Sequence, residues 1–267
     1  MNFEKMPSGD ESVFPKERSE NRACEMYVQE IKRLGNEQQT SDYIELIASE
    51  DCREYTGADE FLEANPGYEE ELNGALSEDE KEALKEYSGY NYKRINSVAR
   101  GFWDYDQLGE RTEEAERRSH QAVEMINGAI DKAPDVNEDF IAYRGTNLDS
   151  FHGYGVSSLE DLKKLEGQFH LERGFMSTSV TEEGSYAGRD FDDPLRKECN
   201  ISMHYRVPAG THEGVLLTGD LSYSGGQSEF LIRSGSLCYI EEVKLSEDGG
   251  SAVIECVLIP RQLYTAE

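Results

Sequence analysis

The residues with the clearest chemical potential lie in the stretch SYSGGQSEFLIRSG, at positions 222–235. It places an amide, Gln227, and a carboxylate, Glu229, two positions apart and directly before an apolar run. Alternation along a β-strand puts both side chains on one face, with Phe230 on the other. A fixed carboxylate can stabilise positive charge that develops in a transition state, so Glu229 is a candidate catalytic group. Gln227 is a neighbouring group that can both donate and accept hydrogen bonds.

Two further segments carry side chains that suit a phosphate-bearing ligand. Arg144 ends the strand-like run DFIAYRGT, where its planar guanidinium can bind phosphate, and Gly145 lets a ligand approach the backbone closely. In FMSTS, alternation puts Ser177 and Ser179 on one face, where Ser177 can orient Glu229. The alternative for each is structural: a surface ion pair for the arginine and ordinary cross-strand hydrogen bonds for the serines.

The elements that position these residues change in character along the chain. Residues 1–20 are polar and are predicted to form a flexible tail, and residues 21–135 follow a helical pattern. Ser77 and Glu80 are spaced as a capping box, and a later helix is predicted to end before Pro134. That helix has one apolar stripe, made of Ala115, Ala122, Ile126 and Ala129.

Residues 136–267 are predicted to form the β-rich part of the same domain. A short helix with Ser157 and Glu160 in capping-box register follows the first strand. Helices followed by strands indicate an α+β fold, with N-terminal helices packed on a mostly antiparallel two-sheet β core. The strand-like runs are DFIAYRGT, RGFMSTSV, NISMHYRV, GVLLTG, QSEFLIRSG, SLCYIEEVKL and SAVIECVLI.

Composition limits the partners of this chain of 267 residues. Its 55 acidic and 27 basic residues give a formal net charge of −28, which disfavours nucleic acid and anionic membranes as partners. The acidic run over 59–82 is interpreted as a solvated surface, or else as a docking face for a basic partner. Five scattered cysteines and five histidines show no metal-ligand spacing, so no metal is expected. We find no apolar stretch long enough to span a membrane and no secretory signal.

Taken in order, these motifs resemble a known family. Arginine on one strand, Ser-Thr-Ser on a second and glutamate on a third resemble the R-S-E signature of mono-ADP-ribosyltransferase toxins. EALKEYSGYNYKRINSVAR resembles the helical Tyr…Ile-Asn-x-x-x-Arg segment of the exoenzyme branch, and YAGR is similar to its loop that contacts phosphate and nicotinamide. GGQSE has the Gln-x-Glu form of the C3-like exoenzymes. The resemblance covers roughly residues 80 to 260 and implies the ADP-ribosyltransferase fold.

The resemblance implies that NAD is the co-substrate, without a metal. The enzyme would break the bond between nicotinamide and ribose, and Glu229, oriented by Ser177, would stabilise the cationic sugar. Gly145 would bind the nicotinamide carboxamide through its backbone, and Phe175 and Tyr186 would be aromatic neighbours of that ring. The residues that would hold the pyrophosphate or assist in doing so are Arg144, Arg189, Arg100 and Asn96.

The same resemblance gives an expectation for the acceptor, an asparagine of a Rho-type GTPase. Gln227 lacks the charge that pairs with an arginine acceptor, so an amide-bearing acceptor is favoured. Tyr223 and Ser224 would contact the acceptor, because the branch carries an aromatic residue in this loop. Alternatives are a protein glutamine, threonine or arginine, a guanine base, or an inactive binding module. We expect a monomer that acts in a target-cell cytosol after secretion or injection, with or without a delivery partner.

Overall fold

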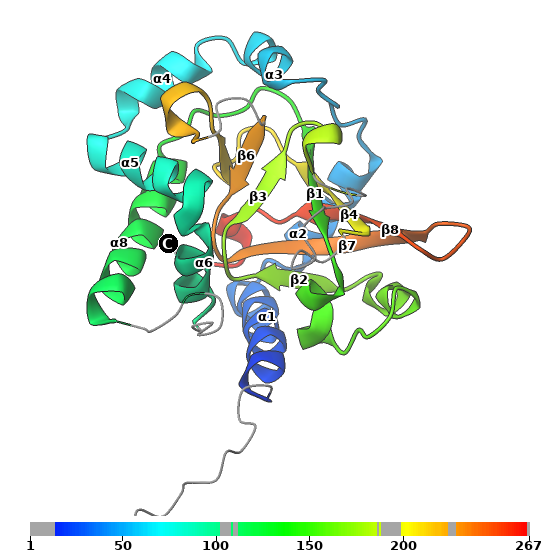
Figure 1. Cartoon of the computed structure of the whole chain (residues 1–267). Coiled ribbons are helices and arrows are strands. Elements are labelled where there is room, and N and C mark those ends of the chain that lie inside the picture. The colour runs from blue at the N-terminus through cyan, green and yellow to red at the C-terminus, as the bar shows by residue number, and fades with distance from the viewer. Residues whose placement is uncertain are drawn as a thin grey trace, which may run out of the picture.

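The first half of the chain is helical, and its helices lie beside the strands of the second half (Figure 1). The computed structural model describes residues 14–101, 108, 112–185, 187, 199–223 and 228–265. Helices α5, α6 and α8 pack together at one side of the sheet, and α1 lies against β2. The helical elements are α1 Phe14–Leu34, α2 Glu37–Ser49, α3 Ala58–Ala64, α4 Tyr68–Ala75, α5 Glu78–Glu86, the π-helix η1 Tyr87–Asn91, α6 Tyr92–Arg100 and α8 Glu113–Asp131.

Local signals in the sequence set several of these helix ends. The capping box is confirmed: the Ser77 hydroxyl accepts from the Glu80 backbone N–H, and the Glu80 carboxylate accepts from the Ser77 N–H. The apolar stripe of α8 is also confirmed, with Ala122, Ile126 and Ala129 buried. Helix α1 begins at Phe14, inside the stretch predicted as a tail. Pro15 does not prevent this, because a proline in the first helical turn removes an N–H that has no partner there.

The strands form one hydrogen-bonded sheet of eight strands among the described residues, in the order β2-β7-β8-β4-β1-β3-β6-β5. All neighbours are antiparallel except β4 and β8. The α+β, mostly antiparallel prediction is therefore confirmed, and the predicted two-sheet core takes the form of one continuous ladder. The strands are β1 Phe140–Thr146, β2 Phe169–Glu172, β3 Met176–Ser179, β4 Ile201–Val207, β5 Gly214–Leu216, β6 Glu229–Ile232, β7 Ser236–Leu245 and β8 Ala252–Leu258.

A narrow seam between β1 and β3 joins the two parts of this sheet. A single residue pair, Tyr143 with Ser179, is in register between these strands, whereas β1 pairs with β4 along its whole length. Strands β3 and β6 consequently run at a steep angle to β2, β7 and β8 (Figure 1). The ladder therefore consists of two half-sheets, β2-β7-β8-β4-β1 and β3-β6-β5, that are joined through this single pair.

The large core lies between the helices and the sheet. Phe61 of α3, Phe140 of β1 and Phe230 of β6 pack with ring centroids 5.0–6.3 Å apart, which ties the helical half to the β-rich half. A second, smaller core under α1 and α2 includes Ile31 and Leu237. These aromatic contacts bury large apolar areas and fix the start of β6, where Glu229 stands.

Two local predictions differ from the structure. Residues Glu160–Leu165 form a 3₁₀-helix, and its cap is shifted by one position: Asp161, not Glu160, accepts from the backbone and hydroxyl of Ser157. The shorter aspartate side chain reaches the serine backbone from this tight turn. Strand β2 was not predicted, because four residues are too few to display an alternating pattern.

Candidate active site

Arg144, Ser177 and Glu229 come together at the seam. Antiparallel pairing of β3 with β6 sets Ser177 opposite Leu231 and Ser179 opposite Glu229. The Ser177 hydroxyl donates to Glu229 Oε1 over 2.5 Å, and Arg144 Nη1 donates to the backbone oxygen of Ser177 over 3.2 Å. The structure therefore places one arginine, one serine and one carboxylate from three strands within a single hydrogen-bonded group.

Glu229 is a buried carboxylate whose ionisation is disfavoured. Its side chain is 8% exposed, and burial raises its pKa above the ordinary glutamate value. The hydrogen bond from Ser177 and the charge of Arg144 both favour the ionised form, but they do not fully offset burial. Buried carboxylates with a shifted pKa are typical of functional sites, where burial strengthens the interaction of the charge with a reacting group.

Asn96 on α6 supports the Ser177 strand from below. Its Oδ1 accepts from the Phe175 N–H over 2.8 Å, and its Nδ2 lies 3.3 Å from the Phe175 oxygen and 3.0 Å from the Tyr87 hydroxyl. Asn96 is buried, and both ends of its amide are used. This placement favours a supporting role for Asn96 over the direct contact with NAD that the sequence suggested.

Tyr87, at the start of η1, is a site residue that the sequence analysis did not single out. Its ring is fully buried, and burial followed by the charge of Glu229 raises its pKa to about 12. Its hydroxyl donates to the Phe175 oxygen over 3.3 Å, so it lies directly beneath the Ser177 strand. The signal was present, because Tyr87 belongs to the Tyr…Ile-Asn-x-x-x-Arg segment.

Arg100 forms a two-point ion pair with Glu172 at the end of β2. Its Nε and Nη2 lie 2.9 and 3.0 Å from the two carboxylate oxygens. Burial opposes ionisation of Glu172, but the charge and hydrogen bonds of Arg100 and the charge of Arg144 outweigh it and lower its pKa to about 2. A side chain at Gly174 would meet Asn96 and Arg100 at about 3 Å, so glycine is needed there. Sequence reasoning missed Glu172 because its partner lies 72 residues away.

The backbone turns sharply just before Glu229. Ser228 has φ +50°, in the left-handed region that non-glycine residues seldom adopt, and β6 begins at Glu229. The Ser228 hydroxyl accepts from the Ala58 N–H at the start of α3, and its carbonyl oxygen accepts from the Val180 N–H. Strand alternation therefore does not extend back through Ser228, so it cannot place Gln227 relative to Glu229.

The remaining predicted residues differ in what the structure says of them. The ring of Phe175 is fully buried against Tyr87, with centroids 5.4 Å apart, so it packs in the core beneath the strand. Gly145 lies on β1 opposite Ser202. Tyr223 is exposed at the end of the segment that follows η5 Gly219–Leu221. Four predicted residues lie outside the described residues: Tyr186, Arg189, Ser224 and Gln227.

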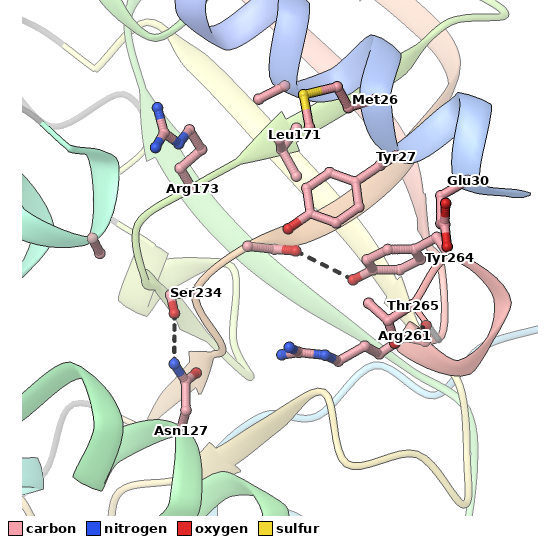
Figure 2. Close-up of a pocket in the computed structure, with 13 residues that line it drawn as sticks. Met26, Tyr27, Glu30, Asn127, Leu171, Arg173, Ser234, Arg261, Tyr264 and Thr265 are labelled. Atoms are coloured by element: carbon pink, nitrogen blue, oxygen red, sulfur yellow. Dashed lines mark hydrogen bonds between the residues drawn. The ribbon is translucent and has the colours of Figure 1, made fainter. Parts of the chain in front are cut away.

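A cavity of about 780 Å³ adjoins this site without including Arg144, Ser177 or Glu229 (Figure 2). Arg173 and Arg261 line it from opposite sides, and the Tyr27 hydroxyl points into it. Asn127 and Ser234, joined by a hydrogen bond of 2.7 Å, line it at the lower left of Figure 2. Ala99 and Arg173 also line the cavity. They are the chain neighbours of Arg100 and Glu172, so the cavity lies next to that ion pair.

Two further observations concern cofactors and membranes. Within the described part of the chain, no three His, Cys, Asp or Glu side chains are grouped so as to hold a metal ion. None of the helices that the structure describes is both long and apolar enough to cross a lipid bilayer.

Comparison with known proteins identifies the family. The model of the ADP-ribosyltransferase exoenzyme family matches residues 64–259, which is more than half of the chain. This chain therefore belongs to the ADP-ribosyltransferase exoenzyme family, a family of transferases. A search of curated protein sequences finds no match.

Solved structures share the fold. C3stau2 from S. aureus, solved with NAD, is 19% identical, with a TM-score of 0.60 over 79% of this chain and 100% of that one. Plx2a, an ADP-ribosyltransferase toxin from Paenibacillus larvae, is 22% identical, with a TM-score of 0.56 over 76% of this chain and 96% of its own. The C3 exoenzyme of Clostridium limosum is 21% identical, with a TM-score of 0.53 over 79% of this chain and 98% of that one. At these identities the likeness establishes the ADP-ribosyltransferase toxin fold.

Proposed function

We propose that this protein is an NAD-dependent mono-ADP-ribosyltransferase whose acceptor is a protein side-chain amide, an asparagine of a Rho-type GTPase. The observation that carries the proposal is the buried Glu229 carboxylate, which Ser177 orients at 2.5 Å while Arg144 lies beside both. Such a group is suited to a reaction in which positive charge develops on a sugar. Membership of the exoenzyme family supports the transferase chemistry.

The reaction exchanges one bond for another at the anomeric carbon of the ribose. The carbon–nitrogen bond to nicotinamide breaks, and its electron pair leaves with neutral nicotinamide. The acceptor nitrogen forms the new bond to the same carbon and releases one proton. The ribose carries most positive charge between these events, so Glu229 stabilises the transition state more than it stabilises bound NAD.

The arginines beside Glu229 suit the pyrophosphate of NAD. Arg144 has a planar guanidinium, which can bind phosphate oxygens at two points. Arg100 would share its guanidinium between Glu172 and phosphate, with Arg189 assisting. Gly145 and Tyr186 are proposed to contact nicotinamide, and the cavity beside Arg173 offers room for the adenosine portion. The C3stau2 structure, which has the same fold and contains NAD, supports NAD as the co-substrate.

The acceptor and the biological setting are proposed from the sequence motif. Gln227 would hold the acceptor amide by donating one hydrogen bond and accepting another, and Tyr223 and Ser224 would contact the surrounding acceptor surface. We propose that the protein works as a secreted or injected monomer in a target-cell cytosol.

The decisive experiment separates NAD cleavage from transfer. Purified protein is incubated with NAD labelled in the adenosine portion, with and without a purified Rho-type GTPase. We expect nicotinamide release in both samples, and label on an asparagine of the GTPase in one. Label on a different class of residue, or on another protein of a cell lysate, would show that the proposed acceptor is wrong. Absence of any nicotinamide release would indicate an inactive binding module.

Replacing Arg144 by lysine tests the grip on pyrophosphate. Lysine keeps the charge but loses the planar two-point geometry. Because hydrogen bonds to charged groups contribute roughly 1.5–3 kcal/mol, we expect kcat/KM for NAD cleavage to fall by about 10- to 100-fold, mostly through KM. Arg118→Lys, the same change on the exposed face of α8, is the control. An unchanged KM for Arg144→Lys would exclude Arg144 from the phosphate site.

Replacing Ser177 by alanine tests the electrostatics of Glu229 through pH. The reactive form is the carboxylate, so activity falls as the pH drops through the raised pKa of Glu229. The Ser177 hydrogen bond favours the carboxylate, and its removal raises that pKa further. We expect the acid limb of the kcat/KM profile to move to higher pH in Ser177→Ala.

The control for this shift is Ser179→Ala on the same strand. Its hydroxyl bonds the Thr181 N–H rather than Glu229, so its acid limb should coincide with that of the wild type. If the acid limb of the kcat/KM profile of Ser177→Ala stays in place or moves to lower pH, ionisation of Glu229 does not determine that limb.

A further inference from the structure

An exposed aromatic pair lies next to the candidate active site. Tyr90 is 83% exposed and Tyr223 is 59% exposed, yet their rings contact each other edge to face with centroids 5.5 Å apart. Five large apolar side chains are exposed in the described part of the chain. Three of them are tyrosines of η1, of α6 and of the segment after η5: Tyr90, Tyr92 and Tyr223. Exposed tyrosines gathered in this way are typical of protein interfaces.

The backbone around this pair is arranged to hold it. The Tyr223 N–H donates to the Ser88 hydroxyl over 2.7 Å, and the Tyr223 ring lies over Gly89, where a side chain would be in contact at 3.4 Å. Gly89 has non-helical angles inside the π-helix η1. The chain is kinked at Gly89, and the kink leaves room for the Tyr223 ring.

Both members of the pair lie close along the chain to residues of the Glu229 site. Tyr87, three residues before Tyr90, donates to the Phe175 oxygen next to the Ser177 strand, and burial followed by the charge of Glu229 raises its pKa. Tyr223 is only six positions before Glu229 in the chain. An acceptor whose side chain reaches Glu229 would therefore meet Tyr90 and Tyr223 at the rim of the site.

The charge beside the pair is opposite to that of the whole protein. Acidic residues outnumber basic ones 55 to 27 in the chain, but Lys85–Arg94 carries three basic residues and one acidic residue. Lys93 and Arg94 follow Tyr90 at i+3 and i+4, are exposed, and make no ion pair with any described residue. Elsewhere exposed arginines such as Arg33 and Arg118 are paired with glutamates.

We infer that Tyr90, Tyr223, Lys93 and Arg94, here called the η1 patch, form the docking surface for the protein acceptor, and that the acceptor presents an acidic face there. The inference rests on the proposed transferase function. Aromatic side chains would supply the buried contact, and the two cations would select and steer an acidic partner in an otherwise repulsive field. Three of the four residues of the η1 patch come from η1 and α6, so acceptor recognition is not confined to the loop before Glu229.

The test compares NAD cleavage with transfer in two patch variants, Tyr90→Ala and Lys93→Glu/Arg94→Glu. The probe is total cytosolic protein of a eukaryotic cell lysate, incubated with NAD labelled in the adenosine portion. We expect both variants to cleave NAD at the wild-type rate but to label the main acceptor band at least about tenfold more slowly. Added salt should slow the wild type and narrow the difference from the charge-reversal variant.

Matched controls lie on helices α1 and α2, outside the patch. Leu46→Ala on α2 removes an exposed apolar side chain, and Lys32→Glu on α1 reverses an exposed charge without touching the patch. Both should label at the wild-type rate. Patch variants that label as fast as the wild type overturn the inference and leave the transferase intact. A wild-type protein that cleaves NAD but labels no lysate protein also overturns it, whereas loss of NAD cleavage in the wild type refutes the proposed function itself.

Discussion

Glu229→Gln is expected to slow nicotinamide release by about 100- to 1000-fold, the range for loss of one preorganised electrostatic group. The glutamine amide has nearly the same shape and can still accept from Ser177, so the site geometry is kept. The change removes the negative charge that, in the proposed mechanism, faces the ribose as nicotinamide leaves. The measurement is the kcat for nicotinamide release at saturating NAD.

The same variant should be at least as stable as the wild type. Burial raises the pKa of Glu229, so its carboxylate is held in the folded state at a cost that a neutral amide avoids. We expect the midpoint of thermal unfolding to stay level or rise while activity falls, as for residues that serve function rather than stability. Glu247→Gln, the same change in an exposed turn, should alter neither quantity. Near-normal release by folded Glu229→Gln protein would refute the assignment of Glu229.

Asn96→Ala is expected to have the largest effect on stability, lowering the free energy of unfolding by roughly 2–4 kcal/mol. The variant leaves the N–H and the carbonyl oxygen of Phe175 without their side-chain partner, and it removes a partner of the Tyr87 hydroxyl. All of these groups are buried, so water does not replace the lost bonds. Denaturant unfolding gives the free energy directly.

The kinetics of the same variant distinguish support from ligand contact. At a temperature where Asn96→Ala is folded, the KM for NAD should stay within about twofold of the wild type, because a contact that was never made is not lost. Asn91→Ala in η1, a nearby asparagine that is not buried, is the control for stability. A large rise in KM with full stability would instead identify Asn96 as a ligand residue.

Much of the fold was predictable because its signals are local. Apolar runs separated by turn residues predict most of the strands, and serine followed three residues later by glutamate predicts the start of α5. The two-sheet expectation did not include the continuity of the ladder, because β1 and β3 are joined through a single pair, Tyr143 with Ser179, which no local pattern encodes. Strand β2 was too short to display a period.

The candidate site was predictable where residue type alone limits the chemistry. The grouping of Arg144, Ser177 and Glu229 agrees with three motifs on three strands. The roles of Asn96 and Arg100 depend on partners 79 and 72 residues away, so the sequence could name them but not say what they touch. Alternation does not extend through the left-handed Ser228, which is held from α3, so the predicted placement of Gln227 beside Glu229 stays a prediction.

Because the two half-sheets meet at a narrow seam, ligand binding there should change the local stability of the sheet. Arg144 belongs to the half that contains β4, β7 and β8, whereas Ser177 and Glu229 belong to the half made by β3, β6 and β5. A dinucleotide bound by both Arg144 and Glu229 would link the two half-sheets across β1 and β3, which are joined through a single residue pair. Its binding energy should then appear as slower amide hydrogen exchange along the whole of β3 and β6.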